Sequence, residues 1–249
     1  MRAAAIGAVL LAAAAPGSAA TRPPPVVEGP FGRGAAQVWL LRPTSRPRSI
    51  VVFGHGWKTS PPSAAHPWVR QFAPWLTHLV AGGSAVIFPR YQLGTGDDFG
   101  AARVDSYRAG LRLGFARIGV AHVPVVAAGY SYGASLAFYY AATAARWRLP
   151  RPVAVDAVFP AGMIPGALLP RPPPALDVLI EIGDRDTVAG AVGARAYWRW
   201  LGSDARRHLV TVRSRGSFVA DHAAPKLSTP TARRAFWLQL DRLLAAVGG

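Results

Sequence analysis

The sequence predicts an α/β fold, in which a mostly parallel central sheet is covered by helices on both faces. Short apolar runs alternate with longer amphipathic segments from residue 36 to the end of the chain, and this alternation is typical of such sheets. Hydrophobic residues make up 51% of the 249 residues and charged residues only 16%. The chain can therefore bury a sizeable core and is not expected to be disordered.

The apolar runs predict strands at residues 36–41, 49–53, 84–88, 123–128, 152–160, 176–182 and 208–212. The amphipathic or alanine-rich segments predict helices at residues 68–81, 101–118, 134–142, 189–201 and 230–247. Residues 21–34 are rich in proline and glycine, and we expect an extended lead-in there. Neither a linker nor an internal repeat divides the chain, so residues 21–249 are expected to form one domain.

Residues 1–20 have the pattern of a secretory signal peptide. Arg2 gives a positive start, an uncharged apolar run follows at 3–15, and Ser18 and Ala20 supply the small residues of a cleavage site after Ala20. The alternatives are an alanine-rich N-terminal helix or a membrane anchor, although the apolar run is short for a membrane span. We expect export, with the mature protein secreted or periplasmic.

The chain has no cysteine and a formal charge of +16. Loss of residues 1–20 would remove Arg2 alone, which leaves 16 − 1 = +15. The basic residues are almost all scattered arginines, and Lys58 and Lys226 are the only lysines. Without a dense basic helix or a nucleic-acid-binding motif, the charge favours contact with anionic envelope components over binding of nucleic acid.

Residues 129–133 read Gly-Tyr-Ser-Tyr-Gly, a G-x-S-x-G pattern that follows a predicted strand and precedes a predicted helix. A serine on a sharp strand-to-helix turn needs small neighbours, and Gly129 and Gly133 occupy those two positions. This context predicts that Ser131 is an exposed nucleophile. The alternative is a chance pattern in a chain with 26 glycines.

With this motif and three further landmarks in the same order, the sequence resembles the α/β-hydrolase family from about residue 36 onward. The resemblance implies that Asp186, in the turn after strand 176–182, is the triad acid, with Asp184 as the competing acid and helix capping as the alternative role. It implies that His222 is the triad base, because only this histidine lies between the last strand and the last helix. The other five histidines are His55, His66, His78, His122 and His208.

The fourth landmark is the Gly54-His55-Gly56-Trp57 turn, which resembles the His-Gly oxyanion turn of the family. The resemblance implies that the backbone N–H groups of Trp57 and Tyr132 bind an oxyanion. His55 is then structural, and the large side chains of Trp57 and Tyr132 are expected to flank the cleft. No cofactor and no metal site are expected, because the histidines lack ligand spacing and no acidic cluster accompanies them.

The interval 161–174, where many members of the family carry a lid, is short and proline-rich. The sequence therefore resembles members with a minimal lid, such as cutinase-like and dienelactone-hydrolase-like proteins, although the latter would normally offer a cysteine nucleophile. The resemblance implies a secreted serine hydrolase that cleaves small-molecule or polymeric carboxylic esters through an acyl-serine intermediate. Two alternatives stay open: an exported acyltransferase with the same triad, and a non-catalytic basic envelope-binding protein on a hydrolase fold.

Overall fold

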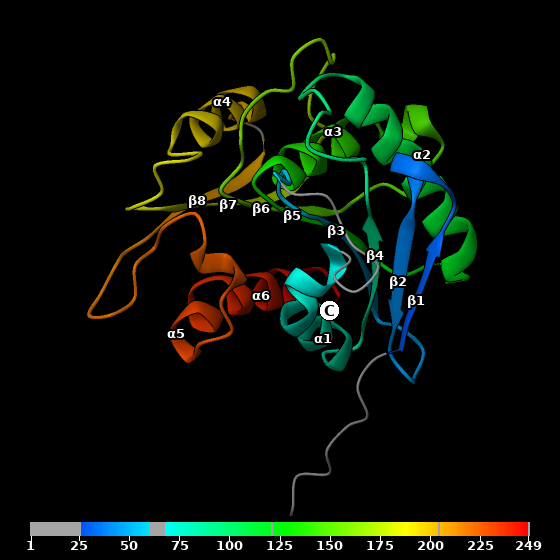
Figure 1. The fold of residues 1–249 in the computed structure, drawn as a ribbon, viewed down its shortest axis with the longest axis horizontal. Helices are drawn as coiled ribbons and strands as arrows, with labels where there is room; N and C mark the ends of the chain where they lie inside the picture. The colour runs from blue at the N-terminus through cyan, green and yellow to red at the C-terminus, as the bar shows by residue number, and fades with distance from the viewer. Residues whose placement is uncertain (1–25, 60–67, 121, 204, 249) are drawn as a thin grey trace, which may run out of the picture.

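The computed structural model describes residues 26–59, 68–120, 122–203 and 205–248, and the predicted signal peptide at 1–20 lies outside them. Its centre is an eight-stranded sheet with the order β1-β2-β4-β3-β5-β6-β7-β8 (Figure 1). The strands are β1 (Val26–Phe31), β2 (Val38–Arg42), β3 (Ser49–Gly54), β4 (Ser84–Pro89), β5 (Val125–Tyr130), β6 (Ala154–Val158), β7 (Asp177–Gly183) and β8 (Arg206–Val212).

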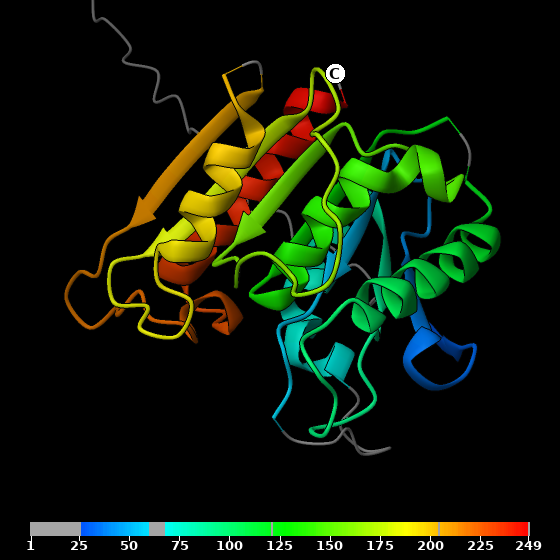
Figure 2. The same ribbon diagram turned by 90° about the horizontal axis from the view of Figure 1, so that it is seen from above.

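Helices cover both faces of the sheet, as predicted (Figures 1 and 2). One face carries α2 (Ala102–Ile118), α3 (Tyr132–Trp147) and α4 (Val192–Leu201), and the other carries α1 (Ala73–Ala81), α5 (Pro230–Ala232) and α6 (Leu238–Val247). A 3-10 turn at Trp68–Phe72 leads into α1, and a π-helical turn at Arg233–Trp237 joins α5 to α6. None of the helices in the described ranges is long and apolar enough to cross a membrane.

Strands β3 to β8 all run parallel to one another, and β2 alone runs in the opposite direction, antiparallel to both of its neighbours, β1 and β4. The lead-in predicted at residues 21–34 is extended over Val26–Phe31, where it also pairs with β2 as an edge strand that the sequence did not predict. Its side chains are half-buried or exposed, with Val26 67% exposed. An edge strand tolerates Pro30 and needs no continuous apolar run, so its sequence resembled a loop.

The central strands are buried on both faces, which explains their continuous apolar runs. Successive side chains point to opposite sides, so Val52 packs beneath α2 and α3 while Val51 and Phe53 pack toward α1 and α6. The second face is aromatic, with Phe53 against Trp75 at 5.3 Å between ring centroids and Trp75 stacked on Trp237 at 6.0 Å. This packing fixes the parallel strands whose carboxyl ends carry the predicted site residues.

Loops at the carboxyl ends of parallel strands meet at one edge of a sheet. The turns after β3, β5 and β7 and the segment after β8 contribute Trp57, Ser131, Asp186 and His222 to that edge. Residues 159–176, between β6 and β7, contain neither helix nor strand. The prediction of a minimal lid in this interval is thereby confirmed.

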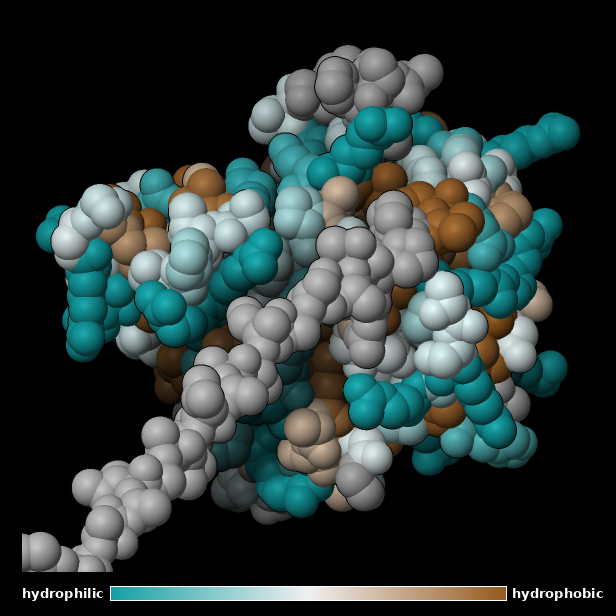
Figure 3. All heavy atoms as spheres, turned by 90° about the horizontal axis from the view of Figure 1, so that it is seen from below, coloured by the Kyte–Doolittle hydropathy of each residue, from teal (hydrophilic) through white to brown (hydrophobic). Residues whose placement is uncertain are grey.

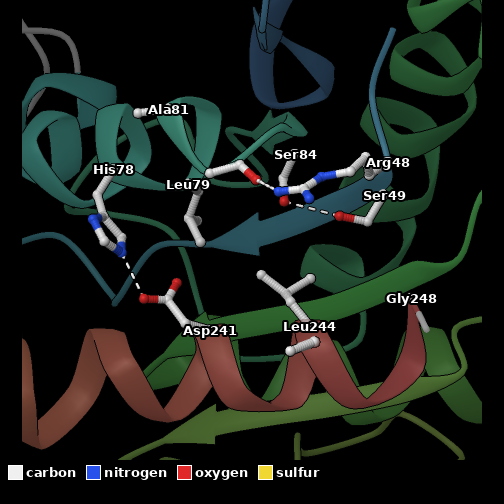
Figure 4. Close-up of a pocket in the computed structure, with 11 residues that line it drawn as sticks. Arg48, Ser49, His78, Leu79, Ala81, Ser84, Asp241, Leu244 and Gly248 are labelled. Atoms are coloured by element: carbon white, nitrogen blue, oxygen red, sulfur yellow. Dashed lines mark hydrogen bonds and ion pairs between the residues drawn. The ribbon is translucent and has the colours of Figure 1, made fainter.

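The opposite edge of the sheet contains a hollow of about 640 Å³ beside the first residues of β3 and β4 (Figure 4). Its polar side chains are bound to one another or to the backbone. His78 Nε2 lies 2.7 Å from Asp241 Oδ2, Arg48 donates to the carbonyl of Gly82, and the Oγ atoms of Ser49 and Ser84 are 2.8 Å apart. The hollow therefore joins α1, α6 and the strand ends, and it contains none of the predicted site residues.

Two acidic residues lie fully buried on neighbouring strands, Asp156 on β6 and Glu181 on β7. Outside the pair itself, no described residue donates a hydrogen bond to their carboxyl oxygens. Burial raises the pKa of Asp156 to about 8. Burial, and then the charge of Asp156, raise the pKa of Glu181 well above its usual value. The pair is therefore neutral in the folded protein at neutral pH.

This acid pair is expected to make the protein less stable as the pH rises. The unfolded chain releases both protons near pH 4, as free carboxyls do, whereas the folded chain keeps that of Asp156 up to about pH 8. Between these values the free energy of unfolding should fall by roughly 1.4 kcal/mol per pH unit for Asp156, and the raised pKa of Glu181 adds a fall of the same sign. In urea unfolding experiments, the free energy of unfolding of the Asp156→Asn/Glu181→Gln variant should depend much less on pH. An exposed control, Asp105→Asn, should keep the slope of the unsubstituted protein, and equal slopes in all three proteins would contradict this interpretation.

Candidate active site

Ser131 lies on the sharp turn between β5 and α3, and its backbone is strained. Its φ is 57° and its ψ is −121°, a conformation that non-glycine residues rarely adopt. The turn is tied to the sheet because the N–H of Ser131 donates to the carbonyl of Val158 at 2.8 Å. The carbonyl of Ser131 then accepts the N–H groups of Ala134 and Ser135 in the first turn of α3.

Three glycines allow this turn to pack against β3. A Cβ atom on Gly133 would lie 2.2 Å from the carbonyl carbon of Gly54, and one on Gly129 would lie 2.4 Å from the carbonyl oxygen of Gly133. Real Cβ atoms do not approach other atoms this closely, so only glycine fits at these positions. The prediction that Gly129 and Gly133 are required by the geometry is consistent with these distances, and Gly54 joins them.

The structure brings the three predicted catalytic side chains together. Nε2 of His222 lies 3.0 Å from Oγ of Ser131, and Nδ1 of His222 lies 2.9 Å from Oδ2 of Asp186. The Asp186 side chain is completely buried and that of His222 is 17% exposed. A hydroxyl, an imidazole and a carboxylate in this sequence form the arrangement that activates a serine for nucleophilic attack.

Asp186 is held as an ionised hydrogen-bond acceptor. Its second oxygen, Oδ1, accepts the backbone N–H groups of Val188 at 2.8 Å and Ala189 at 3.1 Å. Burial acts to raise the pKa of Asp186, but the hydrogen bonds from His222 and from these backbone groups outweigh it and lower the pKa. The competing acid Asp184 instead accepts hydrogen bonds from the N–H and Oγ of Ser214. The geometry therefore favours Asp186 over Asp184.

Asp186→Asn is expected to lower kcat/KM by roughly a thousandfold or more, because an amide at this place no longer holds the imidazole in the required tautomer. Asp184→Asn is the matched control, and it should change kcat/KM by less than about threefold. Steady-state hydrolysis of p-nitrophenyl esters by both variants measures the difference. Equal losses in the two variants would contradict the assignment of Asp186.

Two aromatic residues that the sequence did not indicate position His222. The Tyr130 hydroxyl donates to the backbone carbonyl of His222, and the two rings lie 4.9 Å apart. Phe159, directly after β6, also stacks on the imidazole, with 5.9 Å between ring centroids. The imidazole of His222 therefore contacts one ring from the end of β5 and one from the segment after β6. Tyr130 stands next to Ser131 in the motif, but only the fold shows what its side chain contacts.

The predicted oxyanion turn lies against the nucleophile. A Cβ atom on Gly56 would be 3.2 Å from Cβ of Ser131. Tyr132 is the first residue of α3, so no helical carbonyl accepts its N–H. The N–H of Trp57 donates to none of the residues that the structure describes. Two backbone donors near Ser131 thus have no acceptor among the described residues, as the predicted oxyanion hole requires.

His55 is a buried structural residue rather than a second base. Its Nδ1 lies 2.7 Å from the carbonyl oxygen of Gly56, and its Nε2 lies 2.7 Å from that of Arg90. Burial, and then the charge of Lys58, lower the pKa of His55 to about 3, so the ring stays neutral. Its ring stacks on Tyr91 at 4.2 Å, and Tyr91 donates to the carbonyl of His55. These contacts fix the oxyanion turn.

The expectation that Trp57 and Tyr132 both flank the cleft was wrong for Tyr132. Its ring is buried, stacks on Tyr91 at 5.7 Å, and donates its hydroxyl to the carbonyl of Phe99. These contacts hold the Tyr132 ring in the core instead of at the surface of the cleft. Trp57 is half-buried and stacks on Phe99 at 4.0 Å, and Phe99 is 51% exposed. Trp57 and Phe99 therefore form the aromatic surface near the site.

Within the described ranges, no group of three or more His, Asp or Glu side chains could hold a metal ion. The polar groups gathered around Ser131 are a nucleophile, a base, an acid and two backbone donors. Their arrangement supports acyl transfer through a serine, with water or another hydroxyl as the acceptor.

No protein-family model and no curated protein matches this sequence. Among solved structures, carboxyl esterase 2 from the mycorrhizal fungus Tuber melanosporum is similar over 93% of this chain and 89% of its own, with 13% identity and a TM-score of 0.69. Thermogutta terrifontis esterase 2, phosphorylated by paraoxon, is similar over 91% and 95%, with 17% identity and a TM-score of 0.67. Esterase B from Lactobacillus rhamnosis, inhibited by a tributyrin phosphonate, covers 90% of this chain and 85% of its own, with 13% identity and a TM-score of 0.67. These similarities and the mostly parallel sheet show that the chain has an α/β-hydrolase fold.

Proposed function

We propose that the protein is a serine hydrolase that cleaves carboxylic esters. The observation that carries this proposal is the chain of two hydrogen bonds that links Ser131 to His222 and His222 to Asp186, on a strained turn that presents the serine. The structural neighbours named above include esterases inhibited by phosphorus reagents, which is consistent with this chemistry.

The mechanism follows from the distances. His222 Nε2 removes the proton of Ser131 Oγ as the oxygen attacks the ester carbonyl, and Asp186 stabilises the imidazolium that forms. The N–H groups of Trp57 and Tyr132 bind the tetrahedral oxyanion. His222 then protonates the leaving alcohol, which leaves an acyl group on Ser131. Water, deprotonated by His222, attacks the acyl group and releases the acid.

Substrate size is set by the segments around the site. With only turns between β6 and β7, no lid helix from that interval covers Ser131. Short acyl chains or extended polymeric esters suit such a site better than long chains that need an enclosed tunnel. The half-buried Trp57 and the exposed Phe99 supply apolar surface for the substrate.

Hydrolysis of p-nitrophenyl esters of graded acyl length tests this proposal. Turnover should be highest with short chains and should fall toward long ones. Glycerol or methanol added as competing acceptor separates hydrolysis from acyl transfer. Free acid as the main product supports a hydrolase, whereas mainly transferred acyl groups would identify the alternative, an acyltransferase. No turnover of any ester, with salt-sensitive binding to an anionic polymer, would instead favour a non-catalytic binding protein.

The proposed site of action is outside the cytoplasm, after cleavage that follows Ala20. The support is the sequence pattern of residues 1–20 and the net charge, since a basic exported protein is attracted to anionic envelope polymers. Figure 3 shows hydrophilic side chains spread over the face seen from below. Mass spectrometry of the protein from the culture medium and the cell envelope should find Thr21 as the first residue. A chain that keeps residues 1–20 would contradict export by this route.

A further inference from the structure

The only two lysines of the chain come together beside the active site, although 168 positions separate Lys58 from Lys226 in the sequence, as 226 − 58 = 168. Lys58 directly follows Trp57 of the oxyanion turn, and Lys226 lies four positions after His222, as 226 − 222 = 4. The other basic residues of the mature chain are arginines. This convergence is independent of the hydrogen bonds that define the proposed triad.

Each ammonium group lies over an aromatic ring, and these two rings, Phe72 and Tyr130, are in contact. Nζ of Lys58 is 5.2 Å from the ring centroid of Phe72, and Nζ of Lys226 is 5.7 Å from that of Tyr130. The two rings touch, with 5.8 Å between their centroids. Tyr130 also packs against the ring of His222 at 4.9 Å, so Tyr130 links Lys226 to His222, and Phe72 and Tyr130 together link Lys58 to it.

Lys58 is fixed in place and is not a mobile surface residue. Its backbone N–H donates to Oε1 of Gln92 at 3.0 Å, and Nε2 of Gln92 donates back to its carbonyl at 2.8 Å. Gln92 is fully buried, and Lys58 is only 7% exposed. The side-chain amide oxygen of Gln71 accepts one hydrogen bond from Nζ of Lys58. An ammonium group has three donors, and among the described residues only Gln71 accepts a hydrogen bond from this one.

The two positive charges are not neutralised by the surrounding protein. Among the residues described, no carboxylate lies within ion-pair distance of either ammonium group. Burial, and then the charge of Lys226, lower the pKa of Lys58 to about 7. An anion bound beside both lysines would favour the charged form of Lys58.

We infer that Lys58 and Lys226 form an anion-recognition pair, and that the enzyme therefore prefers esters that carry a carboxylate near the scissile bond. The inference rests on the proposed ester hydrolysis and extends it to a substrate class. A carboxylate would accept hydrogen bonds from both ammonium groups and relieve their repulsion. Neutral esters of the same size would leave the two charges uncompensated.

Two matched pairs of esters test this preference. The first places the charge on the acyl side, with p-nitrophenyl hemiglutarate compared with p-nitrophenyl pentanoate. The second places it on the alcohol side, with para-acetoxybenzoate compared with para-acetoxybenzamide. The ratio of kcat/KM for the anionic over the neutral ester should be about tenfold or more in at least one pair, as expected for a charge-assisted hydrogen bond in a partly desolvated site. The pair with the raised ratio identifies the side of the scissile bond that the lysines face.

Lysine substitutions then link the preference to this pair. Lys226→Met and Lys58→Met should each lower the ratio about tenfold, and Lys226→Arg should restore most of it because the charge is kept. Arg242→Met removes an exposed positive charge on α6 and should leave the ratio unchanged. If Lys58→Met does not fold, the half-buried Lys226 still provides the test.

The outcomes separate this inference from the proposed function. Turnover of neutral esters with a ratio near one in both pairs, or an unchanged ratio in the folded lysine variants, overturns the anion-recognition pair and leaves ester hydrolysis intact. If Arg242→Met lowers the kcat/KM ratio as much as the lysine variants do, the preference is a general effect of charge. This result would also overturn the anion-recognition pair. Absence of turnover with every ester refutes the proposed function, and the substrate preference with it.

Discussion

Ser131→Ala is expected to lower kcat for p-nitrophenyl ester hydrolysis by about ten-thousandfold or more. Ser131 has the only hydroxyl hydrogen-bonded to the imidazole of His222 among the described residues, so its removal leaves no group that can carry the acyl intermediate. Any remaining rate would come from the oxyanion donors and from substrate binding. Steady-state kinetics with an active-site titration of the unsubstituted protein measures the loss.

The fold should survive this substitution, because alanine keeps the β-carbon and the free energy of unfolding should change by less than about 1 kcal/mol. Ser106→Ala is the matched control. Its hydroxyl is exposed on α2 and donates only to the carbonyl of Ala102, so activity should stay at the level of the unsubstituted protein. A Ser131→Ala variant that keeps a tenth of the original kcat would show that another group is the nucleophile.

Gly133→Ala is expected to destabilise the protein by about 3 kcal/mol or more, because the added Cβ overpacks a rigid contact between backbones. That Cβ would lie 2.2 Å from the carbonyl carbon of Gly54 and 2.4 Å from the carbonyl oxygen of His55. Neither atom belongs to a flexible side chain, so β3 and α3 must move apart. For a chain of this length, the melting temperature should fall by about 6 to 12 °C.

The same movement would displace the oxyanion donors from Ser131, and esterase activity should fall even in the fraction that stays folded. Gly96→Ala is the control, since a Cβ there meets nothing within 4 Å. Gly133→Ala should have a lower melting temperature and a lower esterase activity than Gly96→Ala, as measured by thermal unfolding and steady-state kinetics. Similar melting temperatures for both would contradict the close approach of β3 and α3.

The sequence was sufficient to predict the elements that follow a strong periodic or motif signal. The apolar runs of β3 to β7 are buried on both faces, which is why the mostly parallel sheet could be predicted. Ser131, Asp186 and His222 follow strand ends in an order that a serine hydrolase needs, and the structure brings these three side chains within hydrogen-bonding distance. Chain order sufficed here because strands β5, β7 and β8 end at the same edge of one sheet.

Features that depend on contacts between distant segments were not predictable. The edge strand β1 contains Gly29 and Pro30 and lacks an apolar run, so local propensity favoured a loop. The direction of the Tyr132 ring depends on Tyr91, which comes from the segment after β4. The contact between the buried Asp156 and Glu181 cannot be predicted without the register of β6 and β7.

The sequence shows that the chain has only two lysines, but it does not show that they lie near the same site. Two lysines among 28 basic residues stand out in the sequence, but nothing local links Lys58 to Lys226. The contact between Phe72 and Tyr130 links them, and these rings come from the segment before α1 and from the end of β5. The sequence showed only that lysine is rare in this chain. The structure was needed to show that the two lysines are linked through contacting rings.

Labelling with a fluorophosphonate, followed by mass spectrometry of the peptides, tests most directly whether Ser131 is an activated nucleophile. The fluoride leaves as the serine oxygen bonds to phosphorus, so the chain should gain one phosphonyl group on the peptide that contains Ser131. Labelling should be absent in Ser131→Ala and strongly slowed in His222→Ala, because the hydroxyl then lacks its base. An adduct on a different residue, or no adduct in a folded protein that still cleaves esters, would contradict the account.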